Sequence, residues 1–509
     1  MRIAIVGAGP AGLTSAKQAL AEGHEVTVYE STDDVGGIWN PGAGGAYESV
    51  RMQSSRLSFP FSDHPPPFDD DFPTLRQVHQ YLRGYAERFG VLPLVRFGSR
   101  VTRMVKDGAE WSVTAETGAA ASTGAYDAVM VASGELWLPR MPEFLPAPST
   151  GVRVLSAKDY RSPGALAGAK VLVVGGGVSG ADIASELVGV ATTVKWSVRH
   201  RQLFLPRMCG HVYNDELFSY VGRVGVEDMS YAAWLDFLGE LMPEYFAAYR
   251  ASGLLPDEGF HHAVHINDTI IPAVAAGSIE VRPAFDRFEP DGTVVFTDAS
   301  RERYDAVVLC LGYGLPDYSF LADFRREDLY EHHVYWRDSS LAVVNTPVDT
   351  EAFGTACPYF EAIAGWVLSV WSGKTELPAP AAMASWCEQH MGDLQDRRYF
   401  DCWLWTVRLG LESATLPDPA TAFTDYWNVV ASVTAPDNLR PTGAIARPAP
   451  YDKIVDLVGL KHRVLASLAP RVRDRLLNDG QITSGEHRAA AAVPPDRVLA
   501  PSLPYRERR

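Results

Sequence analysis

The sequence has 509 residues, 47% of them hydrophobic, and a net charge of −16. The length suffices for about three globular domains, and so acidic a chain is not expected to bind nucleic acid or a membrane surface. It has no apolar run near the ~20 residues of a membrane span. Five scattered cysteines form no CxxC pair, and the predicted first strand leaves no room for a signal peptide. We therefore expect a cytoplasmic protein.

The first 30 residues follow the order strand, glycine turn, helix, strand. Residues 2–6 are a continuous apolar run typical of a buried strand. A helix is predicted over 10–22 and a second strand over 25–30, and together they form a βαβ unit. The turn between strand and helix has the GxGxxG spacing of a dinucleotide-binding site. Its predicted binding residues are Gly7, Gly9, Pro10, Ala11, Gly12 and the acid Glu30 at the end of the second strand.

The same order returns near residue 170. A strand is predicted over 170–174, a helix over 181–188 and a further strand over 193–197. The turn that joins the first of these strands to the helix contains Gly175, Gly177, Val178, Ser179 and Gly180. The sequence thus predicts a second dinucleotide-binding unit.

The two units differ where the second strand ends. Glu30 lies 23 residues after Gly7, and the same step from Gly175 reaches Val198, which has no acid nearby. An acid hydrogen-bonds ribose hydroxyls and repels a 2′-phosphate, whereas an arginine pairs with that phosphate. The neighbours of Val198 are Ser197, Arg199 and Arg201. We therefore assign FAD to the first turn and NADPH to the second.

A weaker repeat supports duplication. Residues 126–134 and 304–312 both run from Tyr-Asp-Ala-Val to a glycine, and each follows an Asp-Gly hairpin signal. We expect an α/β fold of two Rossmann-like domains, with the NADPH domain inserted into a discontinuous FAD domain. The expected limits are 1–165 and 303–378 for the FAD domain and 166–302 for the NADPH domain, with a helical insertion at about 205–270. A helical C-terminal extension is expected over 379–509, with an extended tail from about 487.

Several further motifs make the sequence resemble the class B flavin-dependent monooxygenases, close to the flavin-containing monooxygenases. They are Gly36-Gly37-Ile38-Trp39, the segment 47–55, 59–61, 71–73, Ser133-Gly134, 310–313 (with Gly312 and Tyr313), Glu361, 372–374 and 377–378. The resemblance covers about residues 1–375. It implies that Gly37, Ile38, Trp39, Met52, Gln53, Ser54, Ser133, Gly134, Asp182, Gly312 and Tyr313 contact the cofactors.

The resemblance also implies a reaction. NADPH reduces FAD, the reduced flavin forms a C4a-(hydro)peroxyflavin with O2, and one oxygen atom passes to a small-molecule substrate. Such chemistry needs a dry pocket and a few aimed donors rather than a side-chain nucleophile or a metal. His261, His262 and His265 lack a carboxylate at zinc-protease spacing, so no metal site is expected. Gln53 is the predicted catalytic side chain, and a homodimer is the working expectation for the assembly.

The sequence departs from the family pattern at three places. In the family fingerprint, the Phe and His positions are Ser149 and Leu155, and Tyr160 comes one residue late. Gln53 replaces the usual Asn under the flavin, and Val178 replaces the Asn of the second turn. Because the Trp-ended fingerprint of Baeyer–Villiger enzymes is also absent, oxygenation of nitrogen or sulfur is favoured. Baeyer–Villiger oxygenation, an NADPH-dependent flavin oxidase or reductase, and a non-catalytic flavin protein remain alternatives.

Overall fold

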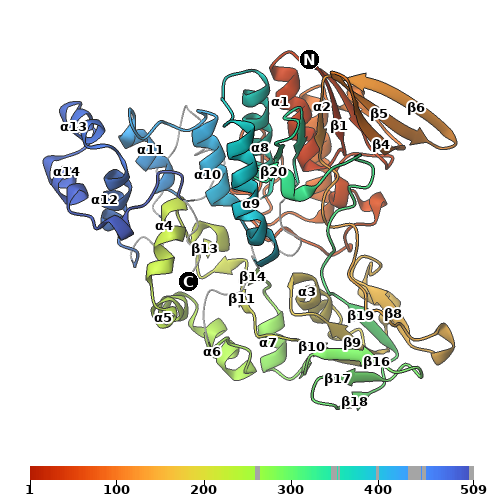
Figure 1. The fold of residues 1–509 in the computed structure, drawn as a ribbon. Helices are drawn as coiled ribbons and strands as arrows, with labels where there is room; N and C mark the ends of the chain where they lie inside the picture. The colour runs from red at the N-terminus through yellow and green to blue at the C-terminus, as the bar shows by residue number, and fades with distance from the viewer. Residues whose placement is uncertain are drawn as a thin grey trace.

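The computed structural model describes residues 1–257, 264–345, 352–353, 356–396, 400–433, 449 and 454–503. In Figure 1 the first dinucleotide unit lies at the upper right and the second at the bottom, and the last helices of the chain lie at the left. Two mainly parallel sheets, one in each unit, organise the fold. None of the helices within these ranges is long and apolar enough to cross a membrane.

The first sheet is built around the N-terminal strand. Its order is β20 (Leu329–Tyr330), β21 (Val334–Tyr335), β22 (Leu341–Val343), β7 (Ala128–Val131), β1 (Arg2–Val6), β2 (Glu25–Tyr29) and β3 (Val95–Arg96). β1 pairs in parallel with both β2 and β7. Its last four residues are buried, as expected for a strand that is covered on both faces.

Helices cover this sheet and hold its turn in place. α1 (Pro10–Ala21) begins directly after the glycine turn and packs against α8 (Ala356–Trp371). α2 (Leu75–Arg88) begins with a capping box in which the Thr74 hydroxyl and the Gln77 side chain each bond the other's backbone N–H. An antiparallel meander of β4 (Ser99–Asp107), β5 (Glu110–Thr117) and β6 (Ala120–Tyr126) projects from the sheet.

The second sheet repeats this plan. Its order is β15 (Glu280–Arg282), β10 (Thr193–Ser197), β9 (Lys170–Val174), β19 (Ala306–Leu309) and β8 (Arg153–Ser156). α3 (Val178–Glu186) follows the second glycine turn. A second meander contains β16 (Phe285–Phe288), β17 (Val294–Phe296) and β18 (Arg301–Glu302). The two repeated segments are thus equivalent strands, because β7 pairs with β1 and β19 pairs with β9.

The strand pairing changes the expected domain limits. β8 lies before residue 165 and β19 lies after residue 303, yet both belong to the second sheet. The limits at 165 and 303 therefore cut through that sheet, because they were placed on turn motifs rather than on strand partners. We propose limits within the connections that precede β8 and follow β19.

Extra elements follow β10 and close the second unit. They are β11 (Leu203–Leu205), β12 (Met208–Cys209), β13 (Val212–Tyr213), α4 (Tyr220–Gly225), α5 (Tyr231–Leu241), α6 (Pro243–Ser252), β14 (Val264–Ile266) and α7 (Ile270–Ala275). The segment expected to be a helical insertion therefore contains two short strand pairs, β11 with β14 and β12 with β13, as well as helices.

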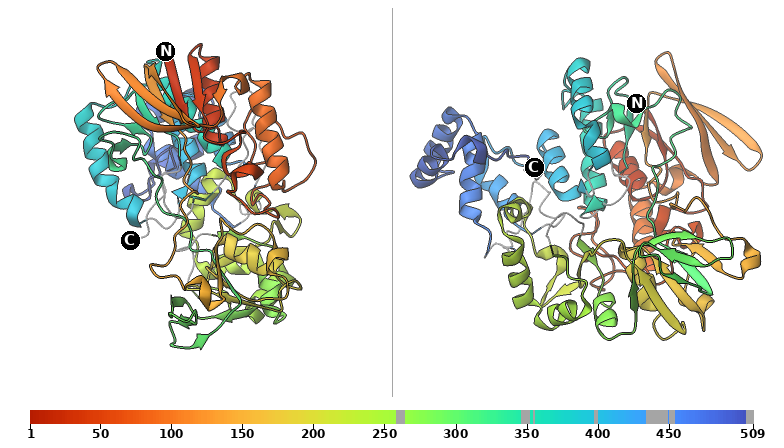
Figure 2. Two further views of the ribbon diagram at one scale, coloured as in Figure 1. Left: turned by 90° about the vertical axis from the view of Figure 1, so that its right-hand side faces the viewer. Right: turned by 60° about the horizontal axis from the view of Figure 1, so that its bottom comes forward.

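The C-terminal part consists mainly of helices, as expected. They are α9 (Pro380–Asp396), α10 (Cys402–Glu412), α11 (Phe423–Val430), α12 (Leu457–Ser467), α13 (Pro470–Asn478) and α14 (Ser484–Ala491); β24 (Phe400–Asp401) pairs with β23 (Ala352–Phe353). The right-hand view of Figure 2 separates α12–α14, in dark blue, from the first sheet. α10 contributes side chains to the cores of both units. The tail predicted to be extended from about 487 is helical up to Ala491.

One buried histidine in the first unit predicts acid sensitivity. His333 follows β20, is fully buried, and lies 2.8 Å from the Val343 carbonyl oxygen through Nδ1 and 2.6 Å from the Tyr359 hydroxyl through Nε2. The neutral ring satisfies both contacts by donating at Nδ1 and accepting at Nε2. Burial lowers the pKa of His333 to about 4 from its ordinary value of 6.5. Its neutral form is therefore stabilising at neutral pH, and this contribution is lost as the pH falls through that window.

We expect the unfolding free energy of the wild type to fall by about 3 kcal/mol more than that of His333→Asn when the pH is lowered from about 7 to about 4. Denaturant unfolding of both proteins at a series of pH values measures the difference. Equal pH dependence in the two proteins would show that another group causes the acid sensitivity.

Candidate functional site

The first glycine turn brings strand, helix and a neighbouring loop into close contact. A Cβ atom at Gly7 would lie 2.3 Å from the Ala132 carbonyl oxygen, and one at Gly12 would lie 1.9 Å from the Gly7 carbonyl oxygen. Gly7 also has a φ of +104°. Only glycine fits at these positions, so the N-terminus of α1 approaches the end of β1 with its backbone N–H groups exposed to a ligand. Pro10 occupies the first helical position, where no N–H partner is needed, and Ala11 is buried behind it.

Glu30 is held beside this turn. Its carboxylate is buried and accepts hydrogen bonds from the backbone N–H of Ala8 and of Thr32, both at 2.8 Å, and from the Thr32 hydroxyl. The side chain of Glu30 is thereby fixed next to the turn. This is the place from which an acid reaches a ribose in a dinucleotide site.

The Gly36–Trp39 segment covers the same turn. The Gly36 N–H donates to the Ala8 carbonyl oxygen at 2.9 Å, and a Cβ at Gly37 would lie 3.1 Å from the Cα of Gly9. Ile38 and Trp39 are half-buried beside it. These residues come together as the motif predicts, and their contact with FAD stays a prediction.

The second turn reproduces the first in detail. A Cβ at Gly175 would lie 2.1 Å from the Cys310 carbonyl oxygen, and one at Gly180 would lie 2.0 Å from the Gly175 carbonyl oxygen. Gly177 caps α3 with φ −83° and ψ −174°, close to the values of −75° and −176° at Gly9. Val178 and Ser179 open the helix, as Pro10 and Ala11 do in the first unit. The structure thus contains two glycine turns of the same geometry.

The residues at the end of β10 differ in their availability to a ligand. The Ser197 hydroxyl is buried and donates to the Pro283 carbonyl oxygen at 2.7 Å. Arg201 is exposed and forms an ion pair with Asp257 at 2.9 Å. Arg199 is also exposed, and no ion pair of its guanidinium is recorded among the described residues. Of the three, Arg199 is best placed to pair with a 2′-phosphate, while Ser197 and Arg201 already have protein partners.

Asp182, in α3, joins the second unit to the first. Its carboxylate accepts hydrogen bonds from the Tyr47 hydroxyl at 2.7 Å and from Asn267 Nδ2 at 2.6 Å. Burial raises the pKa of Asp182, and the two hydrogen bonds oppose that shift. The neighbouring Glu186 accepts from Ser49. The segment of the first unit around residue 47 therefore lies against α3.

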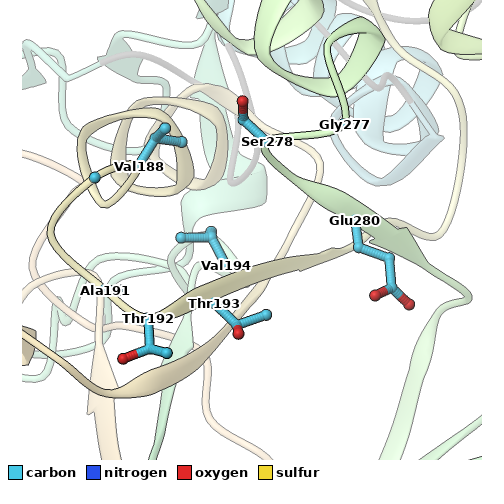
Figure 3. A pocket seen from close by; sticks show the side chains of 9 residues that line it. Val188, Ala191, Thr192, Thr193, Val194, Gly277, Ser278 and Glu280 are labelled. Carbon is cyan, nitrogen blue, oxygen red and sulfur yellow. The ribbon is translucent and has the colours of Figure 1, made fainter.

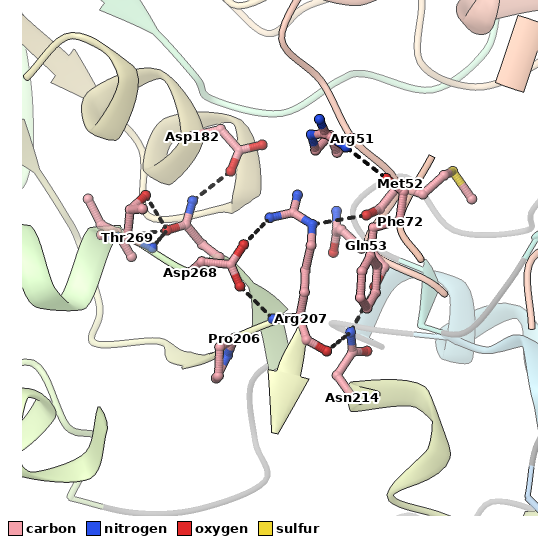
Figure 4. A network of polar contacts seen from close by, with 12 residues as sticks. Arg51, Met52, Gln53, Phe72, Asp182, Pro206, Arg207, Asn214, Asp268 and Thr269 are labelled. Carbon is pink, nitrogen blue, oxygen red and sulfur yellow. Dashed lines mark hydrogen bonds and ion pairs between the residues drawn. The ribbon is translucent and has the colours of Figure 1, made fainter. Parts of the chain in front are cut away.

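The loop that carries Gln53 is held from the same side. Figure 4 shows Arg207 between Asp268 and the loop, and Asn214 below it. Arg207 Nε donates to the Met52 carbonyl oxygen at 3.1 Å, and Asn214 Nδ2 donates to the Gln53 carbonyl oxygen at 2.9 Å. Gln53 and Ser54 are half-buried. Within the described part of the chain, no hydrogen bond is recorded for the Gln53 side-chain amide, so its predicted role towards the cofactors stays a prediction.

The two crossings between the units pair with each other. Pro139 forms an antiparallel bridge with Tyr313, the Arg140 N–H donates to the Gly312 carbonyl oxygen at 2.9 Å, and the Gly314 N–H donates to the Leu138 carbonyl oxygen at 2.8 Å. At the start of the first crossing, Gly134 N–H donates to Asn345 Oδ1 at 2.9 Å. Asn345 Nδ2 also contacts the Ser133 hydroxyl at 3.4 Å. Ser133, Gly134, Gly312 and Tyr313 thus lie at the connections between the units, and their contact with the cofactors stays a prediction.

The degenerate fingerprint forms part of the second sheet. Leu155 lies in β8 opposite Val308, Ser149 lies in the preceding turn, and Tyr160 is buried. The segment therefore contributes a strand to the second sheet, although leucine occupies the position of the family's histidine. Of the histidines weighed as metal ligands, His261 and His262 lie outside the described residues, and His265 is buried against Phe204.

A pocket of about 270 Å³ lies elsewhere. Its lining residues, at 188–194 and 277–280, surround the amino ends of β10 and β15 (Figure 3). Ligands of parallel α/β sheets bind at the carboxyl ends of the strands, where both glycine turns are found. This pocket is therefore not the dinucleotide site.

Several residues of the site were missed by the sequence interpretation. Asn345 holds the first crossing. The loop that carries Gln53 is held by Arg207, by Asn214 and by Asp215, which accepts from the Ser55 N–H. No sequence motif marks these four residues. Only Asn267 carries a local signal, because its Oδ1 accepts from the N–H groups of Thr269 and Ile270 at the start of α7.

Two dinucleotide turns of equal geometry, one beside an acid and one beside arginines, define a flavin- and nicotinamide-dependent oxidoreductase. The comparisons identify the family. A model of the FMO-like family, described as flavin-binding monooxygenase-like, matches residues 1–404. The chain therefore belongs to this family of flavin-dependent monooxygenases, which use FAD, NADPH and O2.

Relatives and solved structures agree with this assignment. The chain is 28% identical over 441 residues to flavin-containing monooxygenase 5 of Cavia porcellus, covering 80% of both chains. It is 27% identical over 422 residues to flavin-containing monooxygenase 3 of Homo sapiens, covering 78% of this chain and 77% of that one. The fold is similar to that of S-allyl-L-cysteine S-oxygenase from Allium sativum, with a TM-score of 0.59, 20% identity and coverage of 81% and 88%. It is also similar to cyclohexanone monooxygenase with bound epsilon-caprolactone, with a TM-score of 0.63, 15% identity and coverage of 81% and 98%.

Proposed function

We propose that this monooxygenase oxygenates a nitrogen or sulfur nucleophile of a small molecule. The oxygen donor in the proposal is a C4a-(hydro)peroxyflavin, formed when O2 reacts with FAD that NADPH has reduced. The observation that carries the proposal is the pair of glycine turns whose neighbouring side chains carry opposite charges. Glu30 is fixed beside the first turn and the exposed Arg199 follows β10 of the second unit, as FAD and NADPH respectively require.

The residues of the chain have separate tasks in this proposal. The N-termini of α1 and α3 bind the two pyrophosphates, and Glu30 accepts from the FAD ribose. Arg199 pairs with the 2′-phosphate of NADPH. Gln53 is the amide donor that faces the reacting groups. The half-buried Asp182 fixes the side chains of Tyr47 and Asn267 between the two units. These side chains bind and orient, and the surrounding cores exclude water.

A heteroatom substrate is favoured over a ketone by the fingerprint segment. The Trp-ended form typical of Baeyer–Villiger enzymes is absent, and Leu155 replaces the histidine. Relatives and neighbours include an S-oxygenase and a protein named as an N-oxide-forming monooxygenase. Because cyclohexanone monooxygenase is also a structural neighbour, oxygenation of a ketone is the second candidate.

The test is a rapid-mixing experiment. The protein is reduced with NADPH without oxygen and then mixed with oxygenated buffer, while the flavin spectrum is followed. We expect a transient species distinct from oxidised and reduced flavin, and faster decay of it with a tertiary amine or a thioether than with a cyclic ketone. Faster decay with the ketone, and formation of a lactone, would favour the second candidate.

The same experiment separates a monooxygenase from an oxidase or a reductase. Direct reoxidation with one hydrogen peroxide for each NADPH, in the presence of every substrate type, would contradict the proposal. The five cysteines are buried and none forms a disulfide, so the chain offers no exposed cysteine pair for disulfide reduction.

A further inference from the structure

The strand pair β12–β13 and its flanking residues form a hairpin, residues 207–215, that reaches from the second unit to the first. Arg207 precedes β12, and Asn214 and Asp215 follow β13. The facing part of the first unit is residues 51–58, with residues 71–73 beside it. Figure 4 shows Arg207 and Asn214 of the hairpin beside Met52 and Gln53 of the loop.

Side chains of the hairpin bind the backbone of the loop at consecutive residues. Arg207 Nε donates to the Met52 carbonyl oxygen at 3.1 Å, and Asn214 Nδ2 donates to the Gln53 carbonyl oxygen at 2.9 Å. The half-buried Asp215 side chain accepts from the Ser55 N–H and the Ser58 hydroxyl. The loop is thus held on both sides of the Gln53 side chain.

The hairpin side chains are themselves fixed. Asp268 accepts from the Arg207 guanidinium at 2.6 Å and from the Arg207 backbone N–H at 2.7 Å. Asn214 Nδ2 also donates to the Arg207 carbonyl oxygen at 3.3 Å. The Arg207 side chain is 14% exposed. Because the side chains of Arg207 and Asn214 are held within the second unit, the position of the loop depends on the position of that unit.

The other face of the loop has matching contacts. The Met52 N–H donates to the Pro73 carbonyl oxygen at 2.9 Å, and the Arg56 N–H donates to the Asp71 carbonyl oxygen at 2.7 Å. Tyr213 of the hairpin packs edge-on against Phe72, with ring centroids 5.5 Å apart. The loop is therefore enclosed between residues 71–73 and the hairpin, and its backbone has little freedom.

We propose that Arg207 and Asn214 are positioning residues that set the place of Gln53 at the reacting groups. This inference rests on the proposed function, because it takes Gln53 as the amide that faces the flavin and nicotinamide. Arg207 and Asn214 contact the backbone carbonyl oxygens of the loop. Their loss is therefore expected to change the efficiency of oxygen transfer without removing a group that takes part in the reaction. A small displacement of such a donor lowers rates by about tenfold or more.

Two variants separate positioning from stability. Asn214→Asp keeps the size of the side chain and removes both of its donated hydrogen bonds. Arg207→Lys keeps a cation beside Asp268 and removes the Nε donor to Met52. Arg303→Gln is the matched control, because Arg303 is an exposed residue of the second unit that pairs with Asp291, far from the loop in the chain.

Hydrogen–deuterium exchange of the full-length holoprotein tests the structural part without any turnover. We expect about fivefold faster exchange in peptides that span residues 52–58 for Asn214→Asp and Arg207→Lys, since each variant loses one hydrogen bond to the loop. Peptides from the β16–β18 meander should exchange as in the wild type, and Arg303→Gln should match the wild type throughout. Unchanged exchange over 52–58 would overturn the proposal.

The functional part is measured as the share of NADPH electrons that appears as hydrogen peroxide, with a substrate that the wild type oxygenates. We expect this share to rise several-fold in both variants and not in Arg303→Gln, with melting temperatures kept close to that of the wild type. Faster exchange with an unchanged peroxide share would show that the hairpin holds the loop without positioning Gln53. If the wild type itself oxygenates nothing, the proposed function fails, and the exchange result still reports whether the hairpin holds the loop.

Discussion

Gly180→Ala should leave FAD bound and stop reduction of the flavin by NADPH, whereas Gly12→Ala should yield protein without flavin. The added Cβ would lie 2.0 Å from the Gly175 carbonyl oxygen in the first variant and 1.9 Å from the Gly7 carbonyl oxygen in the second. No real Cβ contact is so short, so the helix must move away from its strand. Overpacking of this kind costs about 1–3 kcal/mol or more, and the N–H groups at the helix N-terminus move with it.

The size of the effect follows from this displacement. A shift of about 1 Å in a binding group lowers rates by about 100-fold, so we expect at least that loss in the rate of flavin reduction at low NADPH. The flavin-to-protein absorbance ratio and anaerobic reduction rates measure the two variants. Gly164→Ala is the control, since Gly164 is exposed with nothing within 4 Å of its added Cβ. Normal reduction of Gly180→Ala by NADPH would show that the second turn does not bind the nicotinamide cofactor.

The second large effect concerns the choice between NADPH and NADH. Arg199→Ala should raise the KM for NADPH about tenfold, because a charge-assisted contact to the 2′-phosphate is lost from an exposed site. The KM for NADH, which has no such phosphate, should stay unchanged. Steady-state kinetics with both cofactors measures the ratio.

Arg201→Ala is the matched comparison for this prediction. Arg201 already pairs with Asp257 at 2.9 Å, with the two side chains 49% and 87% exposed, so a smaller change in the KM for NADPH is expected. A larger effect at Arg201 than at Arg199 would assign the phosphate contact to Arg201 and would mean that the pair with Asp257 opens on binding.

The predictions from sequence succeeded for the glycine turns and the strands beside them, where the backbone itself determines the structure. Gly12 and Gly180 are required by their contacts with Gly7 and Gly175, five residues earlier in the chain, and Gly7 and Gly175 themselves have φ values of +104° and +126°. The spacing of these glycines in the sequence is therefore enough to predict the two turns. The strands β1, β2, β9 and β10 were predicted within one residue of their observed limits for the same reason.

The predictions were incomplete where distant segments meet. Asn345 and Ser133 are 212 residues apart in the sequence, and Asn214 and Gln53 are 161 apart. No periodicity links such pairs, so the residues that hold the crossings and the loop were not singled out. The limits that we propose differ from those expected for the same reason, because β19 pairs with β8 and β9, which lie more than 130 residues earlier in the chain.

The order of the strands has a consequence for how the protein is made. β22 completes the core of the first sheet by pairing Val343 with Val131, after the whole second unit has been added to the chain. A nascent chain that ends before residue 341 therefore carries both glycine turns but lacks a central partner for β7. Since domains form as units during synthesis, the second unit can complete its sheet on the ribosome once β19 has emerged. The first unit, although it begins the chain, must finish afterwards.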